Sequence, residues 1–323
     1  MWESFALKIK TKKAMRALKS SVTEKMKRIP SFLPRVLLKE TSLDEEIVRF
    51  FFSRYQLVVA NDDDEKEVSF KTRHKVYCEE MKFEQTTASS LEIDQYDDRA
   101  INCYIKHLPT GECAGTIRLV LPKEEDGSLP LEEKFSDAFS SSSLLPSSLT
   151  SEGVCEISRL AVPREFRVRQ FKSKVFPRKK LNKIKQSKNL DFNLEHFPYL
   201  SIALYLMATS VCLHLNMSHA YVLMEPKLAR RMRAFGIHFN EVGEAISFKG
   251  KRVPYRLSPL DFVNDLSKTL KRFQREVHDT MQPSLQKMSL GMSMLDNKVD
   301  YANIDYNSAV FQRVGDSKVS RAA

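Results

Sequence analysis

Clusters of β-branched and aromatic residues mark the predicted strands, because such side chains pack well on a pleated surface. The sequence holds five such clusters, "YQLVVAND", "INCYIKHL", "CAGTIRLVLP", "VCEISRLAV" and "HAYVLME". The second and third are joined through "PTGE", whose Pro and Gly favour a turn, so we expect these two strands to pair. Further along, "NEVGEAISFKGKRVPYRLS" predicts one or two more strands.

Helical signals lie between these strands. Ser42 and Glu45 form a capping pattern that opens a short helix through "IVRFFFSR", and a helix is expected after Asp63 as far as about Met81. The length and apolar density of 199–216 predict a largely buried helix. The stretch "PKLARRMRAFG" begins with Pro and ends with Gly, the asymmetry expected of helix ends.

Two amphipathic stripes flank these elements. The first has apolar residues three or four apart among lysines, at Met15, Leu18, Val22, Met26 and Ile29. The second follows a cap and consists of Val263, Leu266, Leu270, Phe273, Val277 and Met281. From Pro283 onward no period is present, so we expect a mobile tail. The Ser-rich segment 136–151 predicts a surface loop.

The irregular alternation of strands and helices, with antiparallel pairs near the start, predicts an α/β (α+β) fold with a mixed central sheet and helices on both faces. We expect one domain over 46–260 that carries a basic insertion over 164–190. A basic amphipathic extension over 1–45 precedes it, and an amphipathic helix with a mobile tail over 261–323 follows it.

The basic character of the chain is concentrated in two segments. The net charge is +11, yet residues 1–39 carry +9 and residues 164–188 carry +10, so the rest of the chain is net negative. Nucleic acid, an anionic membrane surface or an acidic protein would each fit such patches. Within the second segment, "FKSKVFPRKKLNKIKQSKN" offers only Phe171 and Phe176 as aromatic residues, which disfavours nucleic acid.

Several classes of protein are disfavoured by what the sequence lacks. No G-x-G-x-x-G, phosphate-binding loop or H-E-x-x-H occurs, and there are only nine glycines. The five cysteines are widely spaced without a C-x-x-C pair, so we expect reduced thiols, no metal site and no disulfide framework. The first residues do not form a secretory signal, and no apolar run is long enough to span a bilayer, so we expect a cytoplasmic protein.

Charged residues recur within otherwise apolar surroundings. They are Arg73, Glu80, Asp94, Asp97, Arg118, Glu156 and Arg159. Buried charges are costly unless paired, so we expect several of them to pair with one another. In a regular strand, Glu156 and Ser158 would face one side of the sheet and Arg159 the other, unless a bulge intervenes.

These residues resemble the acyl-homoserine-lactone (autoinducer) synthases in order and spacing. That family carries an Arg with an aromatic four residues on, a later Trp, an Asp-x-x-Asp, a Gly-x-x-Arg and a Glu-x-x-Arg. The corresponding segments here are "RHKVYCEEMKFE", "EIDQYDDRA", "AGTIRLVLP" and "CEISRLAV". The later stretch "MEPKLARRMRAFGIHFNEVGEAISFKGKRVPYRLSP" is more similar to long-chain N-acyl amino acid synthases and to the acyltransferases associated with the PEP-CTERM/exosortase system.

This resemblance implies a GNAT-type N-acyltransferase fold and an acyl-phosphopantetheine thioester on acyl carrier protein as co-substrate, with no bound cofactor. Tyr77 stands where the autoinducer synthases have Phe, and Phe83 where they have Trp. The basic insertion is foreign to their compact form. The segment "PREFRVRQF" lacks the glycine of the pyrophosphate loop that acetyl-CoA-dependent members carry, which favours a carrier protein over coenzyme A.

The resemblance also implies roles for individual residues. Glu156 is the candidate base, Arg159 lies beside it, and a backbone N–H near Leu160 or Val162 would hold the oxyanion. The predicted acceptor and donor pocket is lined by Arg73, Tyr77, Phe83, Asp94, Asp97 and Arg118. Acyl carrier protein is acidic, so we expect it to dock on Lys179, Lys180 and Lys183.

The sequence therefore predicts an N-acyltransferase that moves a long-chain fatty acyl group from acyl carrier protein to the amino group of an amino acid or similar amine. The alternative within enzymes is an autoinducer synthase that uses S-adenosylmethionine. The alternative of another class is a non-catalytic basic protein that binds membranes or nucleic acid. For the enzyme we expect no nucleic-acid partner, and the N-terminal helix offers a peripheral contact with the inner face of the membrane.

Overall fold

The computed structural model describes residues 43–167, 199–233 and 236–295, all within one compact unit that begins at Leu43. The predicted N-terminal amphipathic helix and almost all of the basic insertion, with Lys179, Lys180 and Lys183, lie outside the described residues. Within the described part, no helix is both long enough and apolar enough to cross a bilayer.

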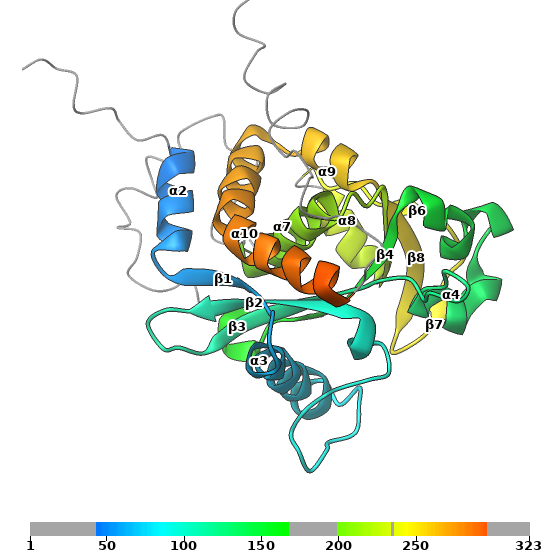
Figure 1. Cartoon of the computed structure of the whole chain (residues 1–323), viewed down its shortest axis with the longest axis horizontal. Helices are drawn as coiled ribbons and strands as arrows, with labels where there is room; N and C mark the ends of the chain where they lie inside the picture. Colours follow the sequence, from blue (N-terminus) through cyan, green and yellow to red (C-terminus); the bar gives the residue numbers. More distant parts are fainter. Residues whose placement is uncertain (1–42, 168–198, 234–235, 296–323) are drawn as a thin grey trace, which may run out of the picture. The chain divides into compact units, whose positions relative to one another are not determined.

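Eight strands of the described chain form one mixed sheet (Figure 1). They are β1 (Tyr55–Val59), β2 (Ala100–His107), β3 (Cys113–Val120), β4 (Val154–Ala161), β5 (His219–Met224), β6 (Asn240–Glu241), β7 (Ile246–Ser247) and β8 (Lys251–Leu257). The order is β1-β2-β3-β4-β5-β8-β6, with β7 paired to β8. Of these pairs, β4 and β5 are parallel and the others antiparallel.

Helices cover both faces of this sheet. One face carries α3 (Asp63–Arg73), which continues directly into a π-helix, η1 (His74–Glu80). The opposite face carries α7 (Tyr199–His214) and α10 (Lys268–Leu295), while α2 (Leu43–Phe52) packs against α10 and β1 (Figure 1). The predicted mixed sheet with helices on both faces is confirmed.

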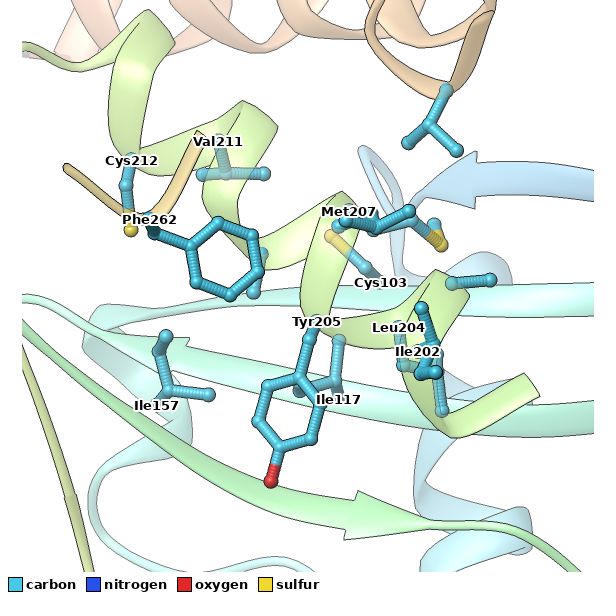
Figure 2. Close-up of a cluster of buried hydrophobic side chains, with 14 of the residues drawn as sticks. Cys103, Ile117, Ile157, Ile202, Leu204, Tyr205, Met207, Val211, Cys212 and Phe262 are labelled. Atoms are coloured by element: carbon cyan, nitrogen blue, oxygen red, sulfur yellow. The ribbon is translucent and has the colours of Figure 1, made fainter. Parts of the chain in front are cut away.

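The core lies between α7 and the sheet. Almost every residue of α7 is buried, which explains its lack of a polar face. Figure 2 shows side chains of α7 such as Leu204 and Met207 in one buried cluster with Ile117 of β3 and Ile157 of β4. Full burial of one such side chain contributes about 1.5 to 3 kcal/mol. Because parallel strands need a long crossover, α7 is also the connection that lets β5 lie parallel to β4.

The Ser-rich segment has more regular structure than the predicted surface loop. After α4 (Pro130–Phe135), it forms the 3-10 helices η3 (Ser136–Ala138), η4 (Ser142–Leu144) and η5 (Pro146–Glu152). Its Phe139, Leu144 and Leu149 pack against a small core with Tyr221 of β5. The chain after β5 likewise forms α8 (Pro226–Arg233) and then three short strands, where one or two strands were predicted.

The C-terminal helix departs from the prediction in two ways. It is divided into α9 (Pro259–Asp265) and α10, and α10 continues through Pro283 to Leu295. The prediction of a mobile tail from Pro283 is therefore wrong as far as Leu295. The reason is that Leu285 and Met288 are buried and continue the apolar stripe, while Pro283 lies on the exposed side of the helix.

Polar side chains also fasten α10 to α7. Gln274 donates to Ser210 at 2.9 Å, and His214 Nε2 lies 2.5 Å from Ser289 Oγ. Burial, and then the nearby His278, lower the pKa of His214 from 6.5 to about 4. As the pH falls below 6.5, His214 of the unfolded chain takes up a proton, whereas His214 of the folded protein stays neutral until about pH 4. Neutral, buried His214 therefore contributes fully to stability above pH 6.5, and this contribution is lost as the pH falls toward 4.

We therefore expect the free energy of unfolding to fall by on the order of 2 kcal/mol through His214 between pH 6.5 and pH 4. The His214→Gln variant stays neutral over this range and should show a shallower decline. Urea unfolding of both proteins at the two pH values measures the difference. An equal decline in the two proteins would show that His214 does not titrate against folding.

Candidate active site

Three arginines and three carboxylates form a buried network on the face of the sheet that α3 covers. Arg73 ends α3 and is fully buried; its two terminal nitrogens contact the two oxygens of Asp97 at 2.6 and 2.9 Å. The Nε of Arg73 donates to Glu92. Such a bidentate contact uses the planar fork of Arg and fixes its orientation as well as its charge.

The other two arginines come from adjacent strands. Arg118 of β3 contacts Asp94 Oδ1 at 2.6 Å and Asp97 Oδ1 at 3.0 Å. Arg159 of β4 donates to Glu92 at 3.0 Å and to Asp94 at 2.8 Å. The segment between η1 and β2 thus supplies all three carboxylates, and the network ties it to α3, β3 and β4.

A β-bulge brings Arg159 to this face. The pairing of β3 with β4 shifts between Thr116–Ala161 and Arg118–Ser158, so that β4 holds one extra residue there. Arg159 adopts a φ of +52°, in the left-handed region that costs a non-glycine residue about 1 to 3 kcal/mol. In a regular strand, Arg159 and Ser158 would lie on opposite faces. Because of the bulge, both side chains contact this network: Arg159 donates to Glu92, and Ser158 accepts from Arg118.

The arginines of the network keep Asp94 and Asp97 ionised. Burial by itself would raise the pKa of Asp94, but the hydrogen bonds and charge of Arg118, and then the charge of Arg159, lower it to about 2. The pKa of Asp97 is also lowered, since Arg73 and Arg118 outweigh the effect of burial. The charges of the three arginines are therefore balanced within the network by Glu92, Asp94 and Asp97.

Glu156 lies apart from this network, on β4, with only 7% of its surface exposed. Its Oε2 accepts a hydrogen bond of 2.6 Å from the backbone N–H of Leu131, in the first turn of α4. Burial raises the pKa of Glu156 to about 7, against the smaller lowering effects of the Leu131 N–H and of Arg118. A carboxyl with this pKa can take up and release a proton near neutral pH.

The sheet opens directly beside Glu156. In the described chain, β4 and β5 pair at only three positions, and the last pair is Glu156 with Tyr221. Beyond it, β4 continues against β3 as far as Ala161, while β5 continues against β8. We call this separation the splay. The bulge and the predicted oxyanion residues Leu160 and Val162 lie on its β4 side.

Tyr77 of η1 contacts the bulge. Its hydroxyl donates to the carbonyl oxygen of Leu160 at 2.8 Å, and the guanidinium of Arg159 lies 5.8 Å from the centre of its ring. Burial raises the pKa of Tyr77 to about 12, so the hydroxyl stays protonated. Phe83 is 37% exposed, and its N–H donates to the carbonyl of Tyr77.

The structure thus gathers most of the predicted residues but changes their relations. Arg73, Arg118 and Arg159 do pair with Asp94 and Asp97, as expected. Glu92 was missed, although it lies two residues before Asp94 in the motif "EIDQYDD". Glu80 does not join the network; it contacts Arg167 and accepts from the N–H of Arg164.

Other features of the described residues lie away from the splay. An open cavity of about 780 Å³ is lined by the residues that follow β3, the start of β4 and neighbouring loops, including Tyr96, Arg99 and Met217. The five cysteines are free thiols. Within the described part of the chain, no three His, Cys, Asp or Glu side chains are grouped to hold a metal ion.

Comparisons with known proteins bear on this site. Residues 72–175 match the family model of an acetyltransferase (GNAT) domain, a range that contains the network, the bulge and Glu156. No curated protein sequence matches the chain. The chain therefore carries a domain of the GNAT type, and the predicted fold and enzyme class, an N-acyltransferase, are confirmed at that level.

Solved structures with a similar chain path include three synthases. FeeM, an N-acyl amino acid synthase from uncultured soil microbes, is 13% identical, with 68% of this chain and 98% of FeeM covered and a TM-score of 0.43. BjaI, a CoA-dependent acyl-homoserine lactone synthase, is 16% identical, with 69% and 89% covered and a TM-score of 0.43. The AHL synthase LasI is 17% identical, with 66% and 95% covered and a TM-score of 0.41. Likeness at this level carries no argument about what this chain acts on.

The buried network gives a direct prediction for stability. Asp97→Asn removes the charge that faces Arg73 and Arg118, so we expect the free energy of unfolding to fall by about 3 to 5 kcal/mol. The neighbouring Asp98 is exposed and provides the matched control, Asp98→Asn, which should change stability by less than about 0.5 kcal/mol. Urea unfolding of the three proteins decides, and equal stability of the two variants would contradict the role given to Asp97.

Proposed function

We propose that this protein transfers a long-chain fatty acyl group from an acyl-carrier-protein thioester to the amino group of an amino acid or similar amine. The observation that carries the proposal is the position of Glu156, at the last residue pair before the splay and with a pKa raised to about 7. An opening between two strands, with a proton acceptor at its edge, suits an extended thioester and an attacking amine.

The chemistry needs no covalent enzyme intermediate. The acceptor's ammonium gives one proton to Glu156, directly or through water, and the neutral nitrogen attacks the thioester carbonyl. The tetrahedral intermediate forms with a negative oxygen, which a backbone N–H near Leu160 or Val162 would stabilise. The C–S bond then breaks with its electron pair on sulfur. The nitrogen loses its second proton and the thiolate gains one, which leaves an amide and a free thiol.

The network limits how the acceptor is held. Arg73 and Arg118 are fully buried and already paired, so they support the site from behind. Arg159 keeps 22% of its side chain exposed, and we propose that it is the arginine that reaches an acceptor's carboxylate. Asp94, whose side chain is 21% exposed beside it, suits an approaching ammonium group.

The described basic surface nearest the end of β5 belongs to α8. Ala229 and Met232 of α8 are buried, whereas Lys227, Arg230, Arg231 and Arg233 are exposed. Since α8 begins two residues after β5 ends, it stands at the end of β5 beyond its last pair with β4. We propose that the acidic carrier protein docks here, in addition to the predicted contact at Lys179, Lys180 and Lys183.

One assay tests the proposed reaction and distinguishes it from autoinducer synthesis. This distinction is needed because the residues of the network resemble the motifs of the autoinducer synthases. Purified protein with an acyl-carrier-protein thioester should release free thiol when single amino acids are supplied, and mass spectrometry should detect the N-acyl amino acid. S-adenosylmethionine alone should give no thiol. Release of thiol with S-adenosylmethionine, together with no release for any amino acid, would favour autoinducer synthesis instead.

Replacement of Glu156 tests the base. Glu156→Gln keeps the size and can still accept the Leu131 N–H, but it cannot take up a proton, so we expect kcat to fall by about 10² or more. Circular dichroism and the midpoint of urea unfolding serve as controls for folding. A folded variant with full activity would assign Glu156 to holding the start of α4 alone.

Charge reversal on α8 tests the donor. Arg230→Glu with Arg231→Glu should raise KM for acyl carrier protein about tenfold or more and leave KM for a small acyl-pantetheine thioester unchanged. Arg275→Glu with Lys287→Glu, on the exposed side of α10, is the matched control and should alter neither value. An unchanged KM for the carrier in the α8 variant would place the docking surface elsewhere.

A further inference from the structure

Tyr205 carries a polar hydroxyl at the end of an otherwise apolar and largely buried side chain. Tyr205 lies in the middle of α7, is only 4% exposed and belongs to the main core. Its ring packs against Phe239 at 6.1 Å, yet its hydroxyl makes no hydrogen bond to any residue that the structure describes. The hydroxyl oxygen is not one of the fully enclosed polar atoms of the described chain, so it borders open space.

The direction of Tyr205 places its hydroxyl at the sheet. Figure 2 shows the ring extending from α7 toward the strands, past Ile117, with its oxygen directed at β4. Burial, and then the nearby Tyr77, raise the pKa of Tyr205. Tyr77 belongs to η1, which continues α3 on the opposite face, and its hydroxyl is fixed on Leu160. Tyr205 therefore approaches, from the α7 side, the same part of β4 that Tyr77 contacts.

This part of β4 has already separated from β5. The last pair between the two strands is Glu156 with Tyr221, and Leu160 lies four residues further along. The loss of the neighbouring strand explains how a side chain on one face can come close to one that belongs to the other. The Tyr205 hydroxyl is thus a proton donor without a partner at the point where the proposed reaction places the thioester carbonyl.

We propose that Tyr205 is a further catalytic residue, whose hydroxyl donates a hydrogen bond to the oxygen of the thioester carbonyl as that oxygen becomes negative. This inference rests on the proposed acyl transfer. The hydroxyl acts as a donor only and keeps its proton throughout, so no proton balance changes. Its raised pKa keeps it protonated at every pH at which the enzyme would work. It would supplement the backbone N–H near Leu160 or Val162.

The Tyr205→Phe variant removes the hydroxyl and little else. Because the charge on the oxygen grows in the transition state, we expect kcat to fall about tenfold to a hundredfold, with KM for both substrates changed less than about threefold. The midpoint of urea unfolding should stay the same, since the variant loses no hydrogen bond to another described residue. If the hydroxyl had only a structural role, its removal would lower stability and would not lower kcat in a protein of unchanged stability.

The matched control is Tyr255→Phe, which removes a hydroxyl that lies 3.3 Å from Glu241 in the core at β8. It should leave kcat unchanged. Wild-type kcat in a folded Tyr205→Phe protein would overturn the inference and leave the proposed function standing. Absence of acyl transfer by the wild-type protein would instead overturn the proposed function, so the two failures are distinct.

Discussion

The contact between Arg73 and Asp97 is the interaction on which the arrangement of the site depends. It lies wholly inside the protein, where an unpaired charge would cost several kcal/mol, so neither partner can be removed alone. Asp97 also contacts Arg118, and through Glu92 and Asp94 the same network holds Arg159. Four separate pieces of chain, which are α3, the segment before β2, β3 and β4, are thereby fixed relative to one another.

The strained backbone of β4 is a consequence of this network. Arg159 adopts a left-handed conformation because its guanidinium is held by Glu92 and Asp94, while Tyr77 holds the next carbonyl. A regular strand would have turned Arg159 into the core on the other face. The bulge follows the early end of the β4–β5 pairing, so the splay begins beside Glu156 and runs along the part of β4 that Tyr77 contacts. Burial away from this network raises the pKa of Glu156 to about 7.

The sequence predicted the parts of this site better than their relations. Order and spacing alone identified Arg73, Asp94, Asp97, Arg118 and Arg159 as a set, because buried charges must pair. The bulge at Arg159 was not predictable in position, since it depends on contacts with residues more than 60 positions away. Glu92 went unnoticed because a single Glu before an Asp-x-x-Asp motif looks like an ordinary surface charge. Tyr205 was hidden within an apolar helix, where its hydroxyl gave no signal of its own.

Other differences have similar causes. The Ser-rich composition of 136–151 predicted a surface loop, but Phe139, Leu144 and Leu149 supply enough apolar surface to fold it onto β5. The lack of a period from Pro283 onward predicted a mobile tail, yet α10 continues because Leu285 and Met288 are buried, which outweighs one backbone hydrogen bond lost at Pro283 on the exposed side. In both places tertiary burial overrides a local preference. The strands β1 to β5 and the helices α2, α7 and α8 were predicted correctly because local pattern and burial agree there.

The most direct test of this account is a crystal structure of the protein with a non-reactive thioether analogue of the acyl-pantetheine donor. The account predicts that the analogue lies in the splay, with its carbonyl oxygen within hydrogen-bond distance of a backbone N–H near Leu160 or Val162 and of the Tyr205 hydroxyl. Its reacting carbon should face Glu156. Binding in the cavity beside Tyr96 and Arg99, with the splay closed, would contradict the claim that acyl transfer takes place where β4 and β5 separate.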